Sequence, residues 1–600
     1  MRAVILAAGM GKRLKDLTQD NTKCMVKVNG VTLIERTLRQ LDKLNLSEIV
    51  IVVGYKKEQL KNFISTLNTT TPIKYIENNI YDKTNNIYSL YLAKDELLKE
   101  DVLLLESDLI FEESVLKCLV EDKRETLALV DKYESWMDGT CVQLGENDVI
   151  ENFVPGKKFV FDDIENYYKT VNIYKFSKHF SQTHYVPFLE AYSMALGNNE
   201  YYEQVLRVIT MLDNPEIMAK RLDGQRWYEI DDIQDLDIAS SIFANSEDEH
   251  LDLISARYGG YWRYPKLKDF CYLVNPYYPP KKLIDEMKSN FETLLTQYPS
   301  GMKVNSLLAA KYFEVKIEHI AIGNGAAELI KSVMDDISGK VGFIRPTFEE
   351  YPNRYNKENS VVYVPEKDGF RYDENDIIKF FGDKKISCLV LINPDNPSGN
   401  YINYKGLLKI VKWCDGKNIQ IIVDESFVDF AEEENTLIDE KVLLSHKNLI
   451  VMKSISKSYG VPGIRLGVVA SSNEELIAKI KKDVAIWNIN SFGEFYLQIA
   501  EKYKKSYAEA LVKIKNERAH FISELEKLPH LKVYPSQANY IMAEVLKGSS
   551  RELTKRLLSD YNLFIKDLSP KIKNGRQYIR LAVRNSEDNA LLLHALKEIL

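Results

Sequence analysis

The stretch MRAVILAAGMGKRL (residues 1–14) predicts a buried strand that runs directly into a glycine-rich loop. Ala3 to Ala7 are all apolar, as expected of a strand covered on both faces of a parallel sheet. The loop lacks the Walker pattern GxxxxGKS/T, because Leu6 stands at its first glycine and an arginine follows the lysine. Glycine amides can still approach a phosphate chain, although the loop alone could also be a simple tight turn. The residues suited to phosphate contacts are Gly9, Gly11, Lys12 and Arg13.

Outward from this strand, short β-branched runs alternate with amphipathic segments, which is typical of βαβ units in a parallel sheet. The amino-terminal segments are 3–7, 33–44, 49–53 and 102–105. A second set of strands is predicted at 341–344, 388–392, 419–423 and 449–453. We therefore predict an α/β chain with two separate sheets; the family resemblance described below implies that the first lies in a Rossmann-like domain with a mixed sheet.

The segment between the two strand sets predicts a domain boundary. Residues 244–250 (ANSEDEH) are polar and acidic and have no hydrophobic period. We place the first domain at 1–243, a linker at 244–252 and the second domain at 253–600, with the second domain divided into large and small subdomains.

Composition and charge exclude several classes of protein. Lys plus Arg is 80 and Asp plus Glu is 87, a net charge of −7, so no bulk basic field favours nucleic acid or an anionic membrane. The six cysteines are far apart, without a CxxC pair, which predicts reduced thiols. No apolar run reaches the roughly 20 residues that cross a bilayer, and the amino terminus does not resemble a signal peptide. We expect a cytoplasmic protein.

The run LAAGMGKRL, followed by Lys23 in TKCMVKV, resembles the signature of sugar-phosphate and choline-phosphate nucleotidyltransferases. The resemblance implies that the loop wraps a nucleoside triphosphate and that Lys23 and Arg13 are catalytic, holding the phosphates and the incoming phosphoryl group. Thr22 replaces the proline that is usual before the signature lysine. The nucleotide-binding residues implied are Leu6, Ala8, Gly9, Gly11 and Lys12.

Two carboxylates extend this resemblance. Asp108 ends the strand VLLLESD, and Asp231 lies in WYEIDDIQDL; by position they match the family's Mg²⁺ ligands. Asp232 is adjacent and could take the place of Asp231.

The segment NNIYSLYL (85–92) resembles the bacterial choline-phosphate cytidylyltransferase branch, which uses CTP. Asn86 and Ser89 are candidate readers of the pyrimidine edge, while Tyr88 and Tyr91 could equally be core residues. Lys132, in LVDKYESW, is the candidate ligand of the acceptor's phosphoryl group. The implied reaction is in-line attack of a phosphate or phosphonate oxygen on the α-phosphorus of CTP, with pyrophosphate leaving.

In the second half, SISKSYGVPGIRLG (454–467) has the pattern of a pyridoxal-phosphate-binding lysine with phosphate ligands beside it. The lysine is Lys457, and Ser454, Ser456 and Arg465 are the expected ligands of the cofactor phosphate. Three further motifs, GNGAAELI (323–330), NPDNPSG (393–399) and VDESFVDF (423–430), stand upstream in the order of fold-type I aminotransferases, which the chain resembles.

That resemblance assigns the other cofactor contacts. Asp424 would pair with the pyridinium nitrogen, Asn396 with the phenolic oxygen, and Phe348, in RPTFEEY, would stack on the ring. Phe427 stands where many relatives have a tyrosine that also contacts the phenolic oxygen. The amides at Gly325 and Ala326 would accept the cofactor phosphate.

The nearest branches look like histidinol-phosphate aminotransferase and threonine-phosphate decarboxylase, whose substrates carry a phosphate. Arg580 and Arg584, in YIRLAVRN, are therefore the candidate anion clamps. Tyr298, in QYPSG, resembles a tyrosine that reaches the cofactor phosphate of the partner subunit, which implies a homodimer.

The two halves together suggest a shared small compound that carries an amine and a phosphoryl group. The whole chain resembles bifunctional 2-aminoethylphosphonate cytidylyltransferase and transaminase enzymes, which interconvert phosphonoacetaldehyde and 2-aminoethylphosphonate and form CMP-aminoethylphosphonate. A phosphoserine decarboxylase joined to a phosphoethanolamine or phosphocholine cytidylyltransferase is the alternative. A third hypothesis is that one domain is inactive and serves as a binding or oligomerisation module.

Overall fold

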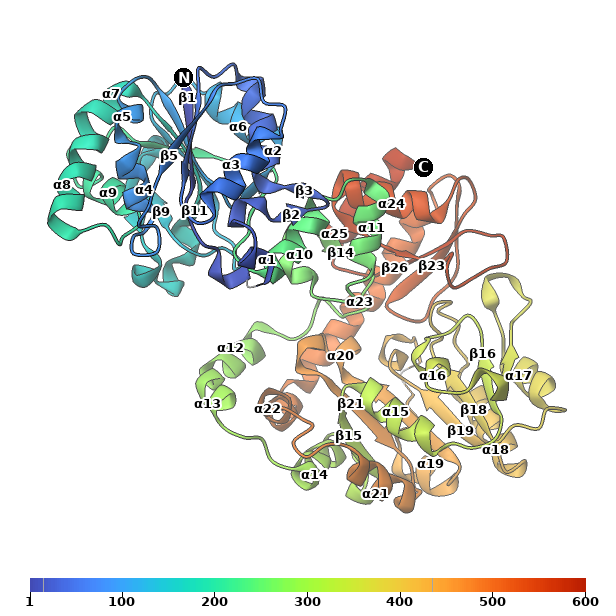
Figure 1. Cartoon of the computed structure of the whole chain (residues 1–600). Helices are drawn as coiled ribbons and strands as arrows, with labels where there is room; N and C mark the ends of the chain where they lie inside the picture. Colours follow the sequence, from blue (N-terminus) through green and yellow to red (C-terminus); the bar gives the residue numbers. More distant parts are fainter. Residues whose placement is uncertain (15, 434) are drawn as a thin grey trace. The chain divides into compact units, whose positions relative to one another are not determined.

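The computed structural model describes residues 1–14, 16–433 and 435–600. The chain divides into two units, Met1–Arg263 and Tyr264–Leu600 (Figure 1). Both are α/β, as predicted. No helix in the described part of the chain is long and apolar enough to cross a membrane.

The first unit is built on a mixed sheet whose main order is β10-β9-β11-β6-β1-β4-β5, with β8 joined to β11 and β12 joined to β8. The central strands β6, β1, β4 and β5 are parallel, whereas β11 runs antiparallel to β6. The bounds are β1 Arg2–Ala7, β4 Ile49–Val53, β5 Ile73–Glu77, β6 Val102–Glu106, β8 Leu127–Lys132, β9 Cys141–Leu144, β10 Ile150–Val154, β11 Tyr167–Phe176 and β12 Met218–Arg221.

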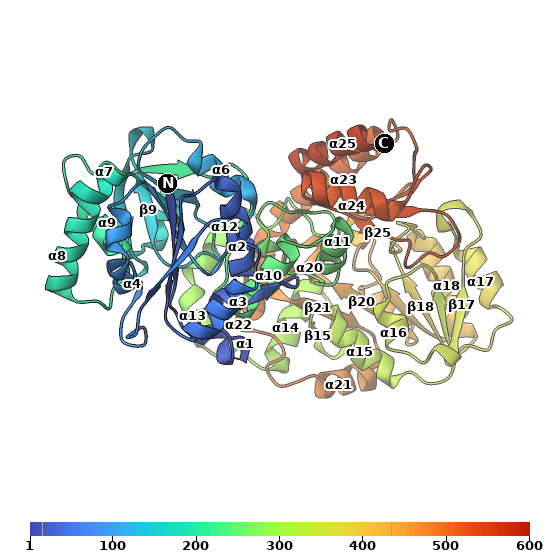
Figure 2. The same ribbon diagram turned by 45° about the horizontal axis from the view of Figure 1, so that its top comes forward.

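Successive strand residues point to opposite sides of this sheet, and in the central strands both sets are buried. Helices therefore cover both faces. Ala3 and Ile5 of β1 join the core beneath one set of helices, and Val4 and Leu6 join the core beneath the other. Figure 2 shows the two sets on either side of the sheet. The first set is α2 Leu33–Leu41, α3 Lys57–Ser65 and α6 Glu113–Val120; the second is α4 Asn86–Leu92, α8 Val186–Leu196 and α9 Glu203–Ile209.

The predicted linker at 244–252 differs from the structure. Residues Glu247–Ser255 form helix α11, for which the Ser246 side chain accepts a hydrogen bond from the Glu249 N–H. Leu251 and Ile254 are buried, and the unit boundary falls later, between Arg263 and Tyr264. The acidic residues that suggested a linker are the first turn of this helix, where negative charge is favourable.

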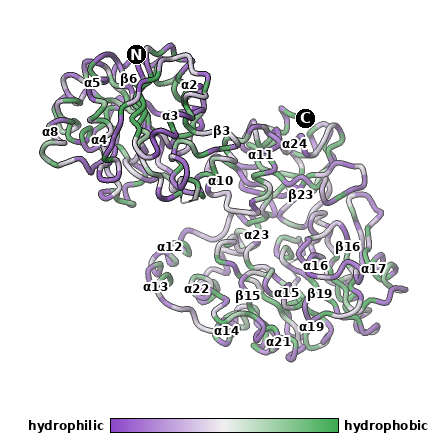
Figure 3. Tube along the Cα trace, in the orientation of Figure 1, coloured by the Kyte–Doolittle hydropathy of each residue, from purple (hydrophilic) through white to green (hydrophobic). Residues whose placement is uncertain are grey.

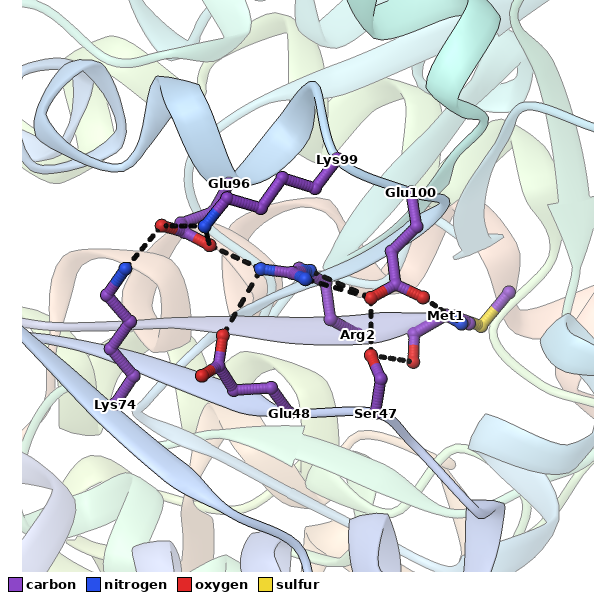
Figure 4. A network of polar contacts seen from close by, with 8 residues as sticks. All are labelled: Met1, Arg2, Ser47, Glu48, Lys74, Glu96, Lys99 and Glu100. Carbon is purple, nitrogen blue, oxygen red and sulfur yellow. Dashed lines mark hydrogen bonds and ion pairs between the residues drawn. The ribbon is translucent and has the colours of Figure 1, made fainter.

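A partly buried ion-pair network lies at the amino-terminal end of β1 (Figure 4). The Arg2 guanidinium contacts Glu96, Glu48 at 3.2 Å and Glu100 at 2.9 Å. Lys74 and Lys99 lie on the far side of Glu96, at 2.6 and 2.8 Å. The Arg2 and Glu96 side chains are only 10% and 5% exposed, so their charges are stabilised by each other rather than by water.

The second unit contains a large and a small sheet. The large sheet has the order β15-β21-β20-β19-β18-β16-β17, in which β21 runs antiparallel to both of its neighbours, β15 and β20, and the pairs from β20 to β17 are parallel. Its bounds are β15 Ile320–Asn324, β16 Val341–Ile344, β17 Ser360–Tyr363, β18 Cys388–Ile392, β19 Gln420–Asp424, β20 Leu449–Ser454 and β21 Leu466–Ala470. The four strands predicted from the sequence are confirmed within one residue.

The small sheet has the order β22-β23-β26-β25 and packs with the long helix α23 (Lys504–Leu525) in a core of its own. The strands are β22 Leu531–Val533, β23 Tyr540–Val545, β25 Lys566–Asp567 and β26 Tyr578–Ala582. Central strands of both sheets, such as β19 and β23, consist mainly of buried apolar residues (Figure 3). This matches the predicted large and small subdomains.

We predict that Arg2→Met destabilises the first unit by about 3 kcal/mol, the low end for breaking a buried pair, because Lys74 and Lys99 remain beside Glu96. Faster hydrogen exchange of the β1 and β4 amides, measured by mass spectrometry, would show this loss of stability. Arg39→Met is the control, since Arg39 is 67% exposed and its pair with Glu35 contributes at most about 0.5 kcal/mol. Equal exchange in both variants would contradict a role for the network in stability.

Candidate active sites

A cavity of about 470 Å³ opens at the carboxyl ends of β1 and β6 in the first unit. The glycine-rich loop between β1 and the short helix η1 (Lys12–Leu14) forms one wall. Gly11 has φ +62°, and a Cβ there would lie 3.0 Å from Thr18 Cγ2 and 3.1 Å from Lys23 Cβ, so this position requires glycine. The cavity brings together these predicted residues: Leu6, Ala8, Gly9, Gly11, Lys12, Arg13, Lys23, Asn86, Ser89, Asp108 and Asp231.

Lys23 lies between the two predicted metal ligands. Its Nζ donates to Asp108 Oδ2 at 2.5 Å and to Asp231 Oδ1 at 2.7 Å, and Arg13 is 3.0 Å from the other Asp231 oxygen. Burial alone would lower the pKa of Lys23, but the two carboxylates outweigh it and raise this pKa. The lysine is therefore a fixed cation at the centre of the site.

A divalent cation fits the carboxylates around Lys23. Ligand oxygens of Asp108, Glu229 and Asp231 all lie within 4.8 Å of one another. Asp108 Oδ1 is buried and has no hydrogen-bond partner among the described residues, so one oxygen is available as a ligand. Glu229, on β13 (Trp227–Glu229), is a residue that the sequence analysis did not single out. Burial, with Asp108 and Asp231 nearby, raises the pKa of Glu229 to about 6, despite the opposing charge of Lys169.

The choice between Asp231 and Asp232 follows from their hydrogen bonds. Asp232 caps helix α10 (Ile233–Ile242), accepting from the N–H groups of Gln234 and Asp235. It is exposed, whereas Asp231 faces Lys23 and lines the cavity. Of the two, Asp231 is thus the residue whose carboxylate belongs to the group that could hold a metal ion, and Asp232 fixes the helix start.

The predicted base-reading residues, Asn86 and Ser89, lie in a polar wall of the cavity, where each has its own hydrogen-bond partners. Asn86 Nδ2 donates to Glu106 at 2.9 Å, and its Oδ1 accepts from the Tyr202 N–H at 3.0 Å. Ser89 Oγ accepts from Asn78 Nδ2 at 3.2 Å. Glu106 lines the same cavity, although the sequence analysis missed it. The wall therefore offers a carboxyl group and amides to a polar ligand.

Lys132 does not line this cavity. Its Nζ donates to the Glu165 carbonyl and lies 4.9 Å from the Tyr168 ring centroid. A second cation near the carboxylates, besides Lys23, is the buried Lys169 of β11, which is 3.3 Å from Glu229 and also helps to lower the pKa of Asp231. The prediction that Lys132 binds the acceptor has no geometric support in the described residues.

In the second unit, Lys457 lies in the one-turn helix α20 (Ile455–Ser458), directly after β20. Burial lowers its pKa to about 8, and the cations Arg580 and Arg465 act in the same direction. A lysine with this pKa has a substantial neutral fraction near physiological pH, which nucleophilic chemistry at its Nζ requires.

Asp424 ends strand β19 and is buried. It accepts hydrogen bonds from the Tyr351 hydroxyl at 2.8 Å and the Ser426 N–H at 2.9 Å. Tyr351 was not predicted as a site residue, yet it fixes the orientation of this carboxylate. Burial raises the pKa of Asp424, and these two hydrogen bonds act against that rise.

A cradle for an anion lies beside Lys457. Gly325 precedes α15 (Ala326–Asp336) at φ +76°, and a Cβ there would lie 2.6 Å from the Arg465 guanidinium. Ser456 Oγ is buried without a partner in the described part of the chain. Ser454, also buried, is held by its N–H to Ser426 Oγ at 3.0 Å. These donors fit the phosphate of pyridoxal phosphate.

The remaining predicted residues differ in their contacts. Arg580 is partly buried and donates to Asn396 Oδ1 at 2.6 Å and to the Cys271 carbonyl at 2.7 Å. Arg584 instead pairs with Asp588 at 2.8 Å and donates to the Asp269 carbonyl.

Three aromatic positions complete the set of predicted residues. Phe348 is 41% exposed, as a ring that stacks on a ligand can be. Tyr298 is 81% exposed and lies 4.7 Å from Trp487 between ring centroids. Phe427 packs edge-on against Tyr540 in the core, which accounts for an apolar residue at this position.

The fold and the two sites define an enzyme with a nucleotidyltransferase domain followed by a pyridoxal-phosphate-dependent aminotransferase domain. Residues 3–139 match the MobA-like NTP transferase domain, and residues 274–597 match the family aminotransferase class I and II. The second match spans more than half of the chain, so the chain belongs to the aminotransferase class I and II family.

Several known proteins are similar to the chain. The CMP-5'-(3-aminopropyl)phosphonate synthase of Streptomyces rubellomurinus is 29% identical over 603 residues, covering 100% of this chain and 95% of that protein. The L-serine phosphate decarboxylase of Sulfurospirillum multivorans is 33% identical, covering 55% of this chain and 88% of its own length. A solved decarboxylase structure from Sulfurospirillum multivorans matches with a TM-score of 0.51 and 31% identity, over 57% of this chain and 90% of that one.

We predict that Asp108→Asn and Asp231→Asn each weaken binding of Mn²⁺, used as a spectroscopic probe, by at least about tenfold, because each removes one of few anionic oxygen ligands. Electron paramagnetic resonance of free Mn²⁺ measures this. Asp232→Asn is the matched control, since asparagine caps a helix as well as aspartate does. A loss of affinity in Asp232→Asn equal to that in Asp231→Asn would reassign the ligand.

We also predict that the rate of pyridoxal phosphate incorporation into the cofactor-free enzyme rises with pH and levels off above a pH of about 8, the pKa of Lys457. The neutral amine is the reactive form, so the rate follows its fraction. In Arg580→Met the midpoint should move to higher pH, because a like charge that lowers this pKa is removed. A rate in the unmodified protein that still rises above pH 10 would contradict the lowered pKa.

Proposed function

We propose that the chain is a bifunctional enzyme: its first unit transfers CMP from CTP to 2-aminoethylphosphonate, and its second interconverts phosphonoacetaldehyde and 2-aminoethylphosphonate. The observation that carries the proposal is the similarity along the whole chain to an enzyme whose name states synthesis of a CMP-aminophosphonate. Both sites retain the residues that such a pair of activities needs, which argues against an inactive domain.

The substrate class follows from what the two sites share. The first offers Lys12, Arg13 and Lys23 to phosphates. The second contains Arg580 beside Lys457, in addition to the cradle at Gly325. A small molecule that carries an amine and a phosphonate suits both sites, so the product of one unit can be the substrate of the other.

In the first unit, we propose that the loop amides bind the triphosphate chain. Lys23 and Arg13 would neutralise its negative charge. We propose that Asp108 and Asp231 hold Mg²⁺, which would neutralise charge on the α-phosphate and the departing pyrophosphate. A phosphonate oxygen attacks the α-phosphorus in line, and the bond to pyrophosphate breaks. Positioning and fixed charge supply most of the rate enhancement, because no strong acid or base is needed.

In the second unit, we assign to Lys457 Nζ the role of accepting the proton released from the carbon that bears the substrate amine. Pyridoxal phosphate, when bound, supplies an electron-withdrawing ring at that carbon. Asp424, oriented by Tyr351, would hold the proton on the ring nitrogen. Asn396 would contact the phenolic oxygen, and its bond to Arg580 links cofactor and substrate recognition.

Decarboxylation of phosphoserine to phosphoethanolamine is the second candidate for this unit. The 33% identity to an L-serine phosphate decarboxylase favours it. The two reactions differ in which bond to the α-carbon is broken. The first unit would then activate phosphoethanolamine or phosphocholine.

We further propose that the second unit forms a homodimer. Tyr298 and its neighbour Trp487 are large and exposed, together with Ile486 and Phe291, as expected of a surface that a second copy covers. Tyr298 would then reach the cofactor phosphate of the partner subunit.

A panel of acceptors tests the proposal. Pyrophosphate release from CTP is measured with 2-aminoethylphosphonate, phosphoethanolamine and phosphocholine, and we expect the phosphonate to give the highest kcat/KM. Lys457→Ala should retain this activity and lose the second one, whereas Lys23→Met should do the reverse. If the phosphonate were the poorest acceptor, the proposed substrate would be wrong.

A parallel assay separates the two candidates for the second unit. Mixing the loaded enzyme with 2-aminoethylphosphonate should convert the bound cofactor to its pyridoxamine form, seen by absorbance. Release of carbon dioxide from phosphoserine, without a response to the phosphonate, would favour decarboxylation instead.

A further inference from the structure

The small sheet contacts the loop that carries Asn396 at two points. The Tyr540 hydroxyl, on β23, donates to the carbonyl of Asp395, the residue before Asn396, at 2.5 Å. From the adjacent strand β26, Arg580 donates to Asn396 Oδ1 at 2.6 Å. The small sheet therefore holds both the main chain and the side chain at this point of the predicted cofactor site.

Tyr540 is itself fixed by its surroundings. It is fully buried, and its ring packs edge-on against Phe427 with 5.1 Å between the ring centroids. Met542 is the ladder partner of Arg580, so Tyr540 and Arg580 lie on one face of the sheet, and the guanidinium is 5.5 Å from the Tyr540 ring centroid. Burial raises the pKa of Tyr540, which keeps its hydroxyl protonated and able to donate.

The bond from Arg580 determines which way the Asn396 amide faces. A guanidinium can only donate, so the amide oxygen must face Arg580, and the Nδ2 group must face away from it. Nδ2 is then the donor for the phenolic oxygen of pyridoxal phosphate, the contact predicted for Asn396. Where this donor lies depends on the main chain of the loop, which Tyr540 holds one residue earlier.

We propose that Tyr540 is a positioning residue of the second site: its hydroxyl fixes the main chain before Asn396 and thereby the place from which the Asn396 amide donates to the cofactor. The inference deepens the proposed function and rests on the cofactor contact assigned there to Asn396. Because the Tyr540 hydroxyl is bonded to a main-chain carbonyl, its effect on the cofactor must pass through Asn396.

Loss of this hydroxyl alone should leave the loop folded. The Asp395 carbonyl also accepts from the Gly399 N–H at 2.7 Å, so it keeps a partner in Tyr540→Phe. The Gly399 carbonyl in turn accepts from the Gln537 N–H of the small subdomain at 3.1 Å. Tyr540→Phe therefore removes one positional restraint and retains the ring that packs against Phe427.

The test uses the full-length protein without substrate. The absorbance of the bound cofactor is titrated with pH, and the Kd of pyridoxal phosphate is measured by equilibrium dialysis. A hydrogen bond donated to the phenolic oxygen stabilises its negative charge and so opposes proton uptake by the cofactor. We expect Tyr540→Phe to move the absorbance midpoint to higher pH by about 0.5 and to raise the Kd about threefold, as for partial loss of one hydrogen bond.

Two comparisons separate positioning from a general structural effect. In the Asn396→Ala background, Tyr540→Phe should cause no further shift of the midpoint, because the residue through which it acts is gone. Tyr534→Phe is the matched control, since it removes a hydroxyl of the same subdomain that donates to Glu544 at 2.9 Å. Its midpoint should equal that of the unmodified enzyme.

An unchanged midpoint and Kd in Tyr540→Phe, or an equal shift in the Asn396→Ala background, would overturn the inference. The proposed function is tested separately, by adding substrates to the unmodified enzyme. If its cofactor absorbance responds to neither 2-aminoethylphosphonate nor phosphoserine, the proposed substrates are wrong, whereas the pH titration still decides the role of Tyr540.

Discussion

Burial of parallel strands on both faces is the constraint on which both units depend. A strand such as β1 or β19 can carry only apolar side chains along its length, because helices cover each face. Polar side chains are therefore confined to the strand ends. The glycine loop follows β1, Asp108 follows β6, Asp424 ends β19, and Lys457 comes just after β20. Each site is assembled from strand ends that the sheet brings side by side.

Motif residues were predictable where the chemistry lies within a short stretch. The glycine loop, Lys23 and the sequence around Lys457 carry their signal locally, and the strands that support them alternate regularly with helices. The structure brings the loop and Lys23 to one cavity, and Lys457 to the helix that follows β20. Asp231 could be separated from Asp232 only once the hydrogen bonds of the helix cap were known.

Residues whose role depends on a distant partner were missed. Tyr351 contacts Asp424, 73 positions later, and nothing in the sequence around it indicates that bond. Glu229 joins Asp108 only because β13 pairs with β7 (Leu109–Phe111). The linker at 244–252 shows the opposite error, because the acidic residues that suggested a linker form the first turn of helix α11. Lys132 lies outside the cavity, so its proposed role has no geometric support there.

The pair Asp231 and Asp232 has a consequence for how the first site responds to its ligands. The backbone N–H groups of both residues donate to Asp235, and Asp232 caps the helix that contains Asp235. The position of the Asp231 carboxylate is therefore set by whether the first turn of α10 is formed. By thermodynamic linkage, a cation that binds Asp231 must also stabilise that turn, and fraying of the turn must lower the affinity of Asp231 for the cation. The affinity of a cation for Asp231 and the order of this helix turn would thus be two measures of a single equilibrium.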